Sequence, residues 1–124
     1  MPRFPVAANN WRDLERHPKL GASWEGLLLQ QVTDWLGAES RDRFFWATHA
    51  GAEIDLVWIR GRRRWGFEFK RTASPALTRS PITARETLGL QKTFVVHAGD
   101  RTFPLHEGVT AVAAARLLED LPRP

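Results

Sequence analysis

The spacing of apolar side chains changes along the chain from a helical to an alternating pattern. Apolar residues recur every three to four positions at Trp24, Leu28, Val32 and Leu36. With Gly37 as a stop signal, this spacing predicts a helix over about 22–36. The segments 43–49, 52–60 and 63–71 are rich in aromatic and branched residues, with breaks at Gly51 and Gly61. They predict three consecutive antiparallel strands.

The second half of the chain contains signals for one more helix and further strands. Ser80 before Pro81 predicts the N-cap and first position of a short helix that ends near Gly89. The near-continuous apolar run 92–99 is typical of a strand covered on both faces. Weak strands are expected at 102–107 and 108–113, followed by a terminal helix over 114–121. That helix is expected to pack three leucines on one side, namely Leu117, Leu118 and Leu121.

This order of elements favours an α/β (α+β) fold, αβββαβ with a mixed central sheet flanked by helices. The 124 residues fit a single domain over 21–121, preceded by a lead-in segment over 1–20 that contains Pro2, Pro5 and Pro18. The chain has no Cys, which excludes disulfides and thiolate metal ligands, so a metal site here must use oxygen or imidazole.

Charge and hydropathy bear on the partners and the location of the protein. Lys and Arg total 18 against 14 acidic residues, a net charge of +4, which suits a polyanion such as nucleic acid. A composition bias toward Arg explains the same excess without a partner. No apolar run reaches the roughly 20 residues of a membrane span, and no signal-peptide segment begins the chain, so a cytoplasmic protein without membrane contact is expected.

Polar residues that are suited to catalysis or metal binding lie on the second and third predicted strands. Side chains alternate along a strand, so Phe67 and Phe69 point to one face and Glu68 and Lys70 to the other. A hairpin near Gly61 brings Asp55 of the preceding strand close to Glu68. Glu25 shares the helix side that should face the sheet.

These residues match the requirements of metal-dependent phosphodiester hydrolysis. Mg²⁺ or Mn²⁺ takes oxygen ligands, here expected from Asp55, Glu68, the Phe69 carbonyl and Glu25. Lys70 would orient or deprotonate a water molecule. In the alternative interpretation, Glu68 and Lys70 form a solvated pair on an exposed strand face, worth under about 1 kcal/mol. No two histidines have metal-ligand spacing, and His97 is expected to be a satisfied buried imidazole.

At these residues the chain resembles the PD-(D/E)XK nuclease superfamily, which has a restriction-endonuclease-like fold. The matching elements are Glu25 on the first helix, Ile54-Asp55 at the PD position, and Glu68-Phe69-Lys70 as the (D/E)XK element. A closer resemblance is to the uncharacterised C-terminal domain of predicted prokaryotic AAA-type ATPases. It covers about residues 17–115 and rests on HPKLGASWEGLLLQQ, GAEIDLV, GFEFKRT and KTFVVHAG.

The resemblance implies a Mg²⁺-dependent nuclease domain acting on DNA phosphodiesters. Its catalytic residues would be Glu25, Asp55, Glu68 and Lys70. Independently of the resemblance, Arg62 and Arg63 at the predicted hairpin tip, and Arg71, are expected to contact phosphates next to the site, and the alternative for each is a solvated polar surface. The alternative is a non-catalytic module that docks to or regulates an AAA-type ATPase, or binds DNA. The chain has no GxxxxGK[ST] loop, so ATP binding would belong to another domain. An oligomer is compatible with either reading.

Overall fold

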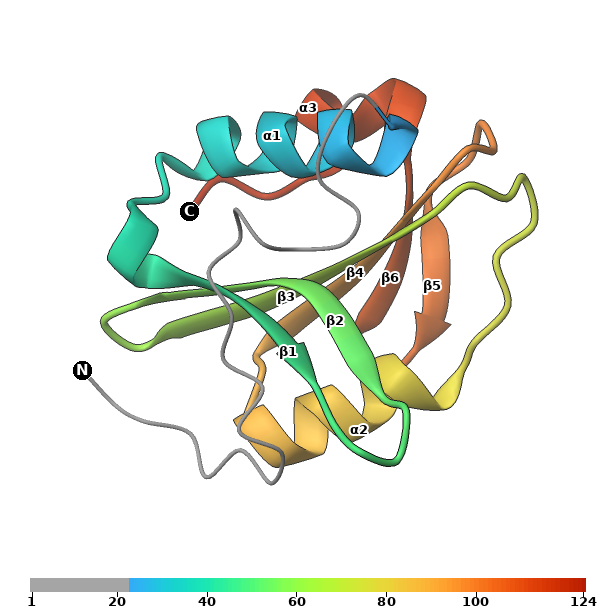
Figure 1. The fold of residues 1–124 in the computed structure, drawn as a ribbon. Helices are drawn as coiled ribbons and strands as arrows, with labels where there is room; N and C mark the ends of the chain where they lie inside the picture. Colours follow the sequence, from blue (N-terminus) through green and yellow to red (C-terminus); the bar gives the residue numbers. More distant parts are fainter. Residues whose placement is uncertain (1–22) are drawn as a thin grey trace.

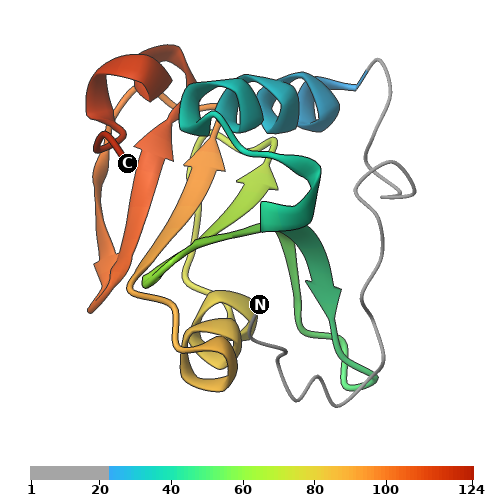
Figure 2. The ribbon, with the colours of Figure 1, turned by 90° about the vertical axis from the view of Figure 1, so that its left-hand side faces the viewer.

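A six-stranded mixed sheet separates two helical layers, with α1 and α3 over one face and α2 over the other (Figures 1 and 2). The structure is a computed structural model that describes residues 23–124. The helices are α1 (Trp24–Leu36), α2 (Arg79–Leu88) and α3 (Leu117–Asp120), with short 3₁₀ turns at Ser40–Asp42 and Ala114–Arg116. The strands are β1 (Arg43–Ala47), β2 (Glu53–Arg60), β3 (Arg63–Lys70), β4 (Lys92–His97), β5 (Phe103–His106) and β6 (Val109–Ala113).

The sheet combines an antiparallel part with a parallel part. The strand order is β1-β2-β3-β4-β6-β5, in which β1, β2 and β3 pair antiparallel and β3, β4 and β6 pair parallel. This confirms the predicted α/β class and the three antiparallel strands. The parallel strands end in register at Lys70, His97 and Ala113. We call this side of the sheet the carboxyl edge.

Helix α1 has sequence-encoded signals at both ends. The Ser23 hydroxyl accepts a hydrogen bond from the Gly26 N–H at 3.0 Å, and Gly37 adopts φ 62° while its N–H reaches the Asp34 carbonyl. The buried side of α1 packs with Phe67 and Phe69 of β3 in one core. The helix therefore covers the face of β3 opposite to Glu68 and Lys70.

A second core lies under α2, on the other face of the sheet. It joins Ala84 and Leu88 of α2 to Trp46 of β1, to Leu90 in the loop before β4, and to three residues of β2, namely Ile54, Val57 and Ile59. Trp58 and Trp65 are buried in the first core, so the strand tryptophans serve packing. The two cores hold β2 and β3 from both sides, which fixes the strands that carry the candidate site.

The beginning of α2 differs from the sequence prediction. The helix begins at Arg79 with Thr78 as the N-cap, two residues before the predicted start, so the assignment of Ser80 as N-cap is wrong. The Ser80 hydroxyl instead accepts a hydrogen bond from the Glu53 N–H at 3.1 Å, which ties α2 to the start of β2. Pro81 stays in the first turn, where its missing N–H costs no helical hydrogen bond.

The terminal helix also corrects one prediction. Leu117 and Leu121 are buried, whereas Leu118 is 57% exposed, so the three leucines do not share one side. Residues four apart lie on the same face of a helix and adjacent residues do not, which explains the difference. The strands predicted in the tail are confirmed as β5 and β6. Within residues 23–124, none of the helices combines the length and the apolar character that crossing a membrane requires.

Candidate functional site

The main-chain hydrogen-bond ladder between β2 and β3 stops before the two strands end. Beyond it, the side chain of an aspartate bonds to the neighbouring strand. The last paired residues are Leu56 and Phe67. Beyond them, Oδ2 of Asp55 accepts a hydrogen bond from the Phe69 N–H at 2.8 Å. A side-chain carboxylate therefore occupies the place where a regular antiparallel ladder would present a main-chain carbonyl. We call Asp55, Glu68, Phe69 and Lys70 the β2–β3 fork.

Glu68 stands at the fork as a buried acid beside a partly exposed lysine. Its residue is 6% exposed, and its Oε1 lies 3.5 Å from Nζ of Lys70, whose side chain is 29% exposed. Asp55 is 1% exposed. The interpretation of Glu68 and Lys70 as a solvated pair on an exposed face is contradicted by this burial. Both acids are buried away from bulk water. A buried carboxylate is energetically costly unless it is paired.

Lys70 is anchored by the segment that follows β3. Its Nζ lies 3.4 Å from the Thr78 hydroxyl, and its carbonyl accepts a hydrogen bond from the Thr72 N–H at 2.8 Å. Thr78 is also the N-cap residue of α2. This contact was not predicted from the sequence, in which its signal is a hydroxyl residue just before the helix.

Glu25 stands apart from the other predicted site residues. It lies in the first turn of α1 and is half-buried, whereas Glu68 and Lys70 face the α2 side of the sheet. Among residues 23–124 there is no group of three His, Cys, Asp or Glu side chains that could hold a metal ion. The structure thus brings together Asp55, Glu68 and Lys70, and does not add Glu25 as a third acid.

The donors present at the fork fit a hard divalent cation. Asp55 and Glu68 supply carboxylate oxygens, and the Phe69 carbonyl faces the same neighbouring strand as the Phe69 N–H that meets Asp55. Mg²⁺ is commonly bound by one or two carboxylates, with waters in the remaining positions. The residues that would hold such an ion are Asp55, Glu68 and Phe69.

The arginines predicted to contact phosphates are divided between the two ends of β3. Arg62 and Arg63 lie at the exposed β2–β3 turn, and Lys70 lies at the other end of the strand, about 23 Å away at 3.3 Å per residue. Arg71 is exposed and follows Lys70 directly. Of the three, only Arg71 is next to the fork. Arg62 and Arg63 can contact the same nucleic acid only if it extends along the length of β3.

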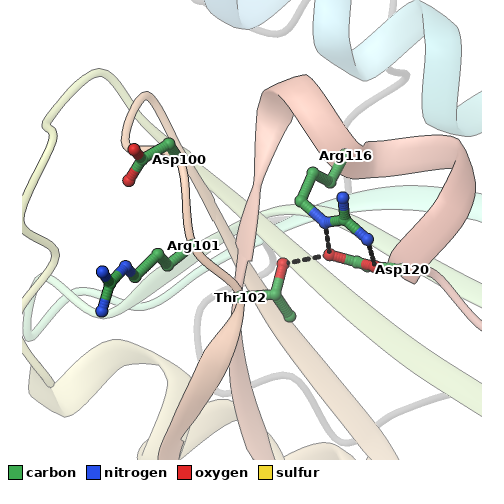
Figure 3. Close-up of a pocket in the computed structure, with 5 residues that line it drawn as sticks. All are labelled: Asp100, Arg101, Thr102, Arg116 and Asp120. Atoms are coloured by element: carbon green, nitrogen blue, oxygen red, sulfur yellow. Dashed lines mark hydrogen bonds and ion pairs between the residues drawn. The ribbon is translucent and has the colours of Figure 1, made fainter.

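A hollow of about 600 Å³ at the carboxyl edge is lined by Asp100, Arg101, Thr102, Arg116 and Asp120 (Figure 3). Asp120 accepts hydrogen bonds from Arg116 at 2.9 and 3.1 Å and from the Thr102 hydroxyl at 2.6 Å. The bond from Arg116, followed by that from Thr102, lowers the pKa of Asp120. The Asp120 bond and charge raise the pKa of Arg116. The charges of Arg116 and Asp120 thus compensate each other, and the bond from Thr102 connects α3 to the loop before β5.

Comparisons with known proteins place the chain among uncharacterised relatives. It is 42% identical over 105 residues to the uncharacterized protein Rv2008c of Mycobacterium tuberculosis (strain ATCC 25618 / H37Rv). It is equally similar to the uncharacterized protein Mb2031c of Mycobacterium bovis (strain ATCC BAA-935 / AF2122/97). The alignment covers 85% of this chain but only 23% of each relative, so the chain spans about a quarter of their length.

No solved structure matches the chain significantly. A family model matches residues 20–117, which include every element from α1 to the start of α3. This match agrees with the resemblance to an uncharacterised domain that the sequence motifs indicated. The chain belongs to the family described as "Domain of unknown function (DUF4143)".

Proposed function

We propose that this domain is a Mg²⁺- or Mn²⁺-dependent nuclease that acts on DNA phosphodiesters in the manner of the PD-(D/E)XK superfamily. The observation that carries the proposal is the burial of Asp55 and Glu68 together at the β2–β3 fork, beside Lys70. A buried ion pair rarely adds net stability, so stability alone does not explain Glu68 beside Lys70. Chemistry at the fork would explain this pair, and Asp55 in addition accepts the Phe69 N–H.

Each residue of the fork has a separate task in this proposal. The Phe69 N–H fixes the orientation of the Asp55 carboxylate. Glu68 presents its carboxylate from the next strand, and the Phe69 carbonyl completes the set of protein oxygens. A divalent cation held by these residues would supply charge compensation to a phosphate and would acidify water. The burial of Asp55 and Glu68 would strengthen these interactions because it excludes bulk solvent.

Lys70 is the residue that meets the substrate and the attacking water. Its side chain is partly exposed while its Nζ stays 3.5 Å from Glu68 and 3.4 Å from the Thr78 hydroxyl. These two oxygens fix the ammonium group at the mouth of the fork. From there it can donate hydrogen bonds to a water molecule or a phosphate oxygen and offset the charge that develops in the transition state.

The test combines metal binding with cleavage on the same samples. Mn²⁺ and Mg²⁺ are titrated by calorimetry into the wild type and Asp55→Asn, and plasmid nicking is then measured for both and for Lys70→Met. We expect Mn²⁺ binding that Asp55→Asn abolishes, and a loss of nicking of about 100-fold or more in Lys70→Met. The matched control is Lys92→Met, which removes an exposed lysine over Trp65 on the neighbouring strand and should keep full nicking.

Two results would contradict the nuclease proposal. One is an absence of both metal binding and nicking in the folded wild type. The other is nicking that survives Lys70→Met and Asp55→Asn unchanged, since this would assign the cleavage to a contaminant. Circular dichroism of each variant excludes unfolding as the cause of a lost signal.

A second candidate is a non-catalytic module that docks to an AAA-type ATPase. The observation that favours it is the length of the mycobacterial relatives, of which this domain corresponds to only 23%. A domain within a longer chain often packs against its neighbours. Binding of this domain to the purified remainder of the Mycobacterium tuberculosis relative tests it. Docking predicts measurable affinity that Asp55→Asn and Lys70→Met leave unchanged.

A further inference from the structure

The loops that follow β3 and β4 are joined at the carboxyl edge. The Ala98 N–H donates to the Thr72 carbonyl at 2.8 Å, and the Thr72 N–H donates to the Lys70 carbonyl at 2.8 Å. Lys70 and His97 are direct neighbours in the parallel register of the two strands. The main chain at Lys70 is therefore linked, through Thr72, to the residues just after His97.

The closest approach between these loops is at Gly99. A Cβ atom at this position would overlap the Ala73 carbonyl oxygen and would lie 2.9 Å from Nδ1 of His97. Such distances are far shorter than van der Waals contact, and one of the two atoms belongs to the backbone, which cannot easily move. Glycine is therefore required at residue 99 because the loop after β3 rests directly on it.

His97 holds Gly99 in this place. Its Nδ1 accepts a hydrogen bond from the Gly99 N–H at 3.0 Å, and the residue is 1% exposed. The ring also lies against Phe103, with the ring centroids 5.7 Å apart. Nδ1 is thus the acceptor in this contact, whereas the buried Nε2 has no hydrogen-bond partner among the described residues, so the imidazole is satisfied at one ring nitrogen and not at both. A buried imidazole thus fixes the turn that supports the segment after Lys70.

We propose that His97 is a positioning residue for Lys70, acting through Gly99 and the segment 71–78. This inference rests on the proposed function, because it assigns His97 a role in setting the lysine of the nuclease site. The same segment provides the Thr78 hydroxyl, 3.4 Å from Nζ of Lys70. Movement of the segment away from Gly99 would displace both the main chain and the ammonium group of Lys70. His97 itself touches neither substrate nor metal in this account.

The test uses two substitutions that differ in one hydrogen-bond acceptor. His97→Asn keeps an acceptor oxygen close to the position of Nδ1, whereas His97→Leu keeps the bulk and removes the acceptor. For plasmid nicking we expect His97→Leu to lower kcat by about tenfold or more with KM for DNA unchanged, since small misplacements of catalytic groups are costly. His97→Asn should restore most of the rate. His106→Leu, on the exposed strand β5, is the matched control.

A second measurement decides the inference without cleavage. The NMR signals of the Lys70 side chain and the hydrogen exchange of the Thr72 and Ala98 amides are compared in the same variants. We expect His97→Leu to shift the Lys70 signals and to speed both exchange rates, and His97→Asn to resemble the wild type. If His97→Leu fails to fold, His97→Gln replaces it, because its amide oxygen lies further out than Nδ1.

These measurements distinguish a failure of the nuclease proposal from a failure of the positioning role of His97. A wild type that binds no metal and nicks no DNA overturns the nuclease proposal, and the assignment of His97 as a residue of that site falls with it. A wild type that nicks, together with unchanged Lys70 signals and unchanged kcat in His97→Leu, overturns the positioning role alone. Equal losses in His97→Leu and His97→Asn also overturn it, because they show that ring packing matters and the acceptor does not.

Discussion

Two places at the carboxyl edge of the sheet each combine an aspartate with a basic residue, and they do so in different ways. At the β2–β3 fork, Asp55 and Glu68 are buried and the cation beside them is partly exposed. At the C-terminal corner, formed by Thr102, Ala113, Arg116 and Asp120, the side chain of Arg116 is 50% exposed and that of Asp120 is 18% exposed, so both charges reach solvent. There, the Thr102 hydroxyl accepts from the Ala113 N–H at 3.1 Å and donates to Asp120, so the polar groups saturate one another.

The difference separates charges that fasten a fold from charges that are available for chemistry. The corner places its ions where water lowers the cost of the charge, and it uses them to connect α3 to the loop after β4. The fork places two carboxylates in the sheet interior, where the cost of desolvation is high. The proposed nuclease function would account for this arrangement, since clustered acids concentrate at functional sites.

The largest effect on stability is expected from the acceptor at the fork. Asp55→Ala leaves the Phe69 N–H without this acceptor in a buried position, whereas Asp55→Asn keeps an amide oxygen there. The free energy of unfolding of Asp55→Ala should be lower than that of Asp55→Asn by about 1–3 kcal/mol. Urea denaturation measures both, with Asp34→Ala on the exposed face of α1 as the control. Equal free energies of unfolding in Asp55→Ala and Asp55→Asn would show that the acceptor at residue 55 does not stabilise the fold.

A smaller effect is expected when the fork loses its ion pair as a whole. The double variant Glu68→Met/Lys70→Met replaces two charged side chains by apolar ones of similar length. Its free energy of unfolding should stay within about 1 kcal/mol of the wild type, or rise, because a buried ion pair adds little net stability. Nicking should be lost at the same time.

The matched experiment at the corner is the double variant Arg116→Met/Asp120→Met. It removes the bond from Thr102 to Asp120 and the bonds from Arg116 to Asp120, and its melting temperature is expected to fall slightly. Thermal unfolding followed by circular dichroism compares the two double variants. A fork variant that loses more stability than the corner variant would break the distinction drawn between the two places.

The smallest effect is the response of the corner to acid. The pKa of Asp120 is lowered by its bonds to Arg116 and Thr102, so the folded state favours the ionised form. Its contribution to stability is fully present above the ordinary carboxyl pKa of 3.8 and is lost as pH falls through the lower pKa of the folded state. Between pH 5 and about pH 2, the melting temperature of Asp120→Asn should therefore fall less than that of the wild type. Glu86→Gln on α2 is the control, and equal losses in all three proteins would contradict this assignment.

The positions of most helices and strands could be predicted because they depend on local spacing. The alternation in β3 separated Phe67 and Phe69 from Glu68 and Lys70, and the structure keeps that separation. The hairpin at Gly61 likewise brought Asp55 to the neighbourhood of Glu68. These features follow from periodicity and turn residues within a short stretch of chain.

What the sequence could not provide depends on contacts between distant segments. Whether Glu68 is exposed is decided by the elements packed over that face, not by its own strand. Ser80 was assigned to a helix cap on local grounds, yet Glu53, 27 residues earlier, uses its hydroxyl. The contact between Gly99 and the Ala73 carbonyl also has no local signal, because it arises where two loops meet.

The hydrogen bond from Phe69 to Asp55 turns one main-chain amide into a spectroscopic reporter. In a regular ladder this amide would face a neighbouring carbonyl and would respond little to events at a side chain. Here its chemical shift depends on the charge and orientation of a single carboxylate. The Phe69 resonance in a ¹⁵N spectrum would therefore test the proposed cation binding at one residue, with no substrate present and no turnover required.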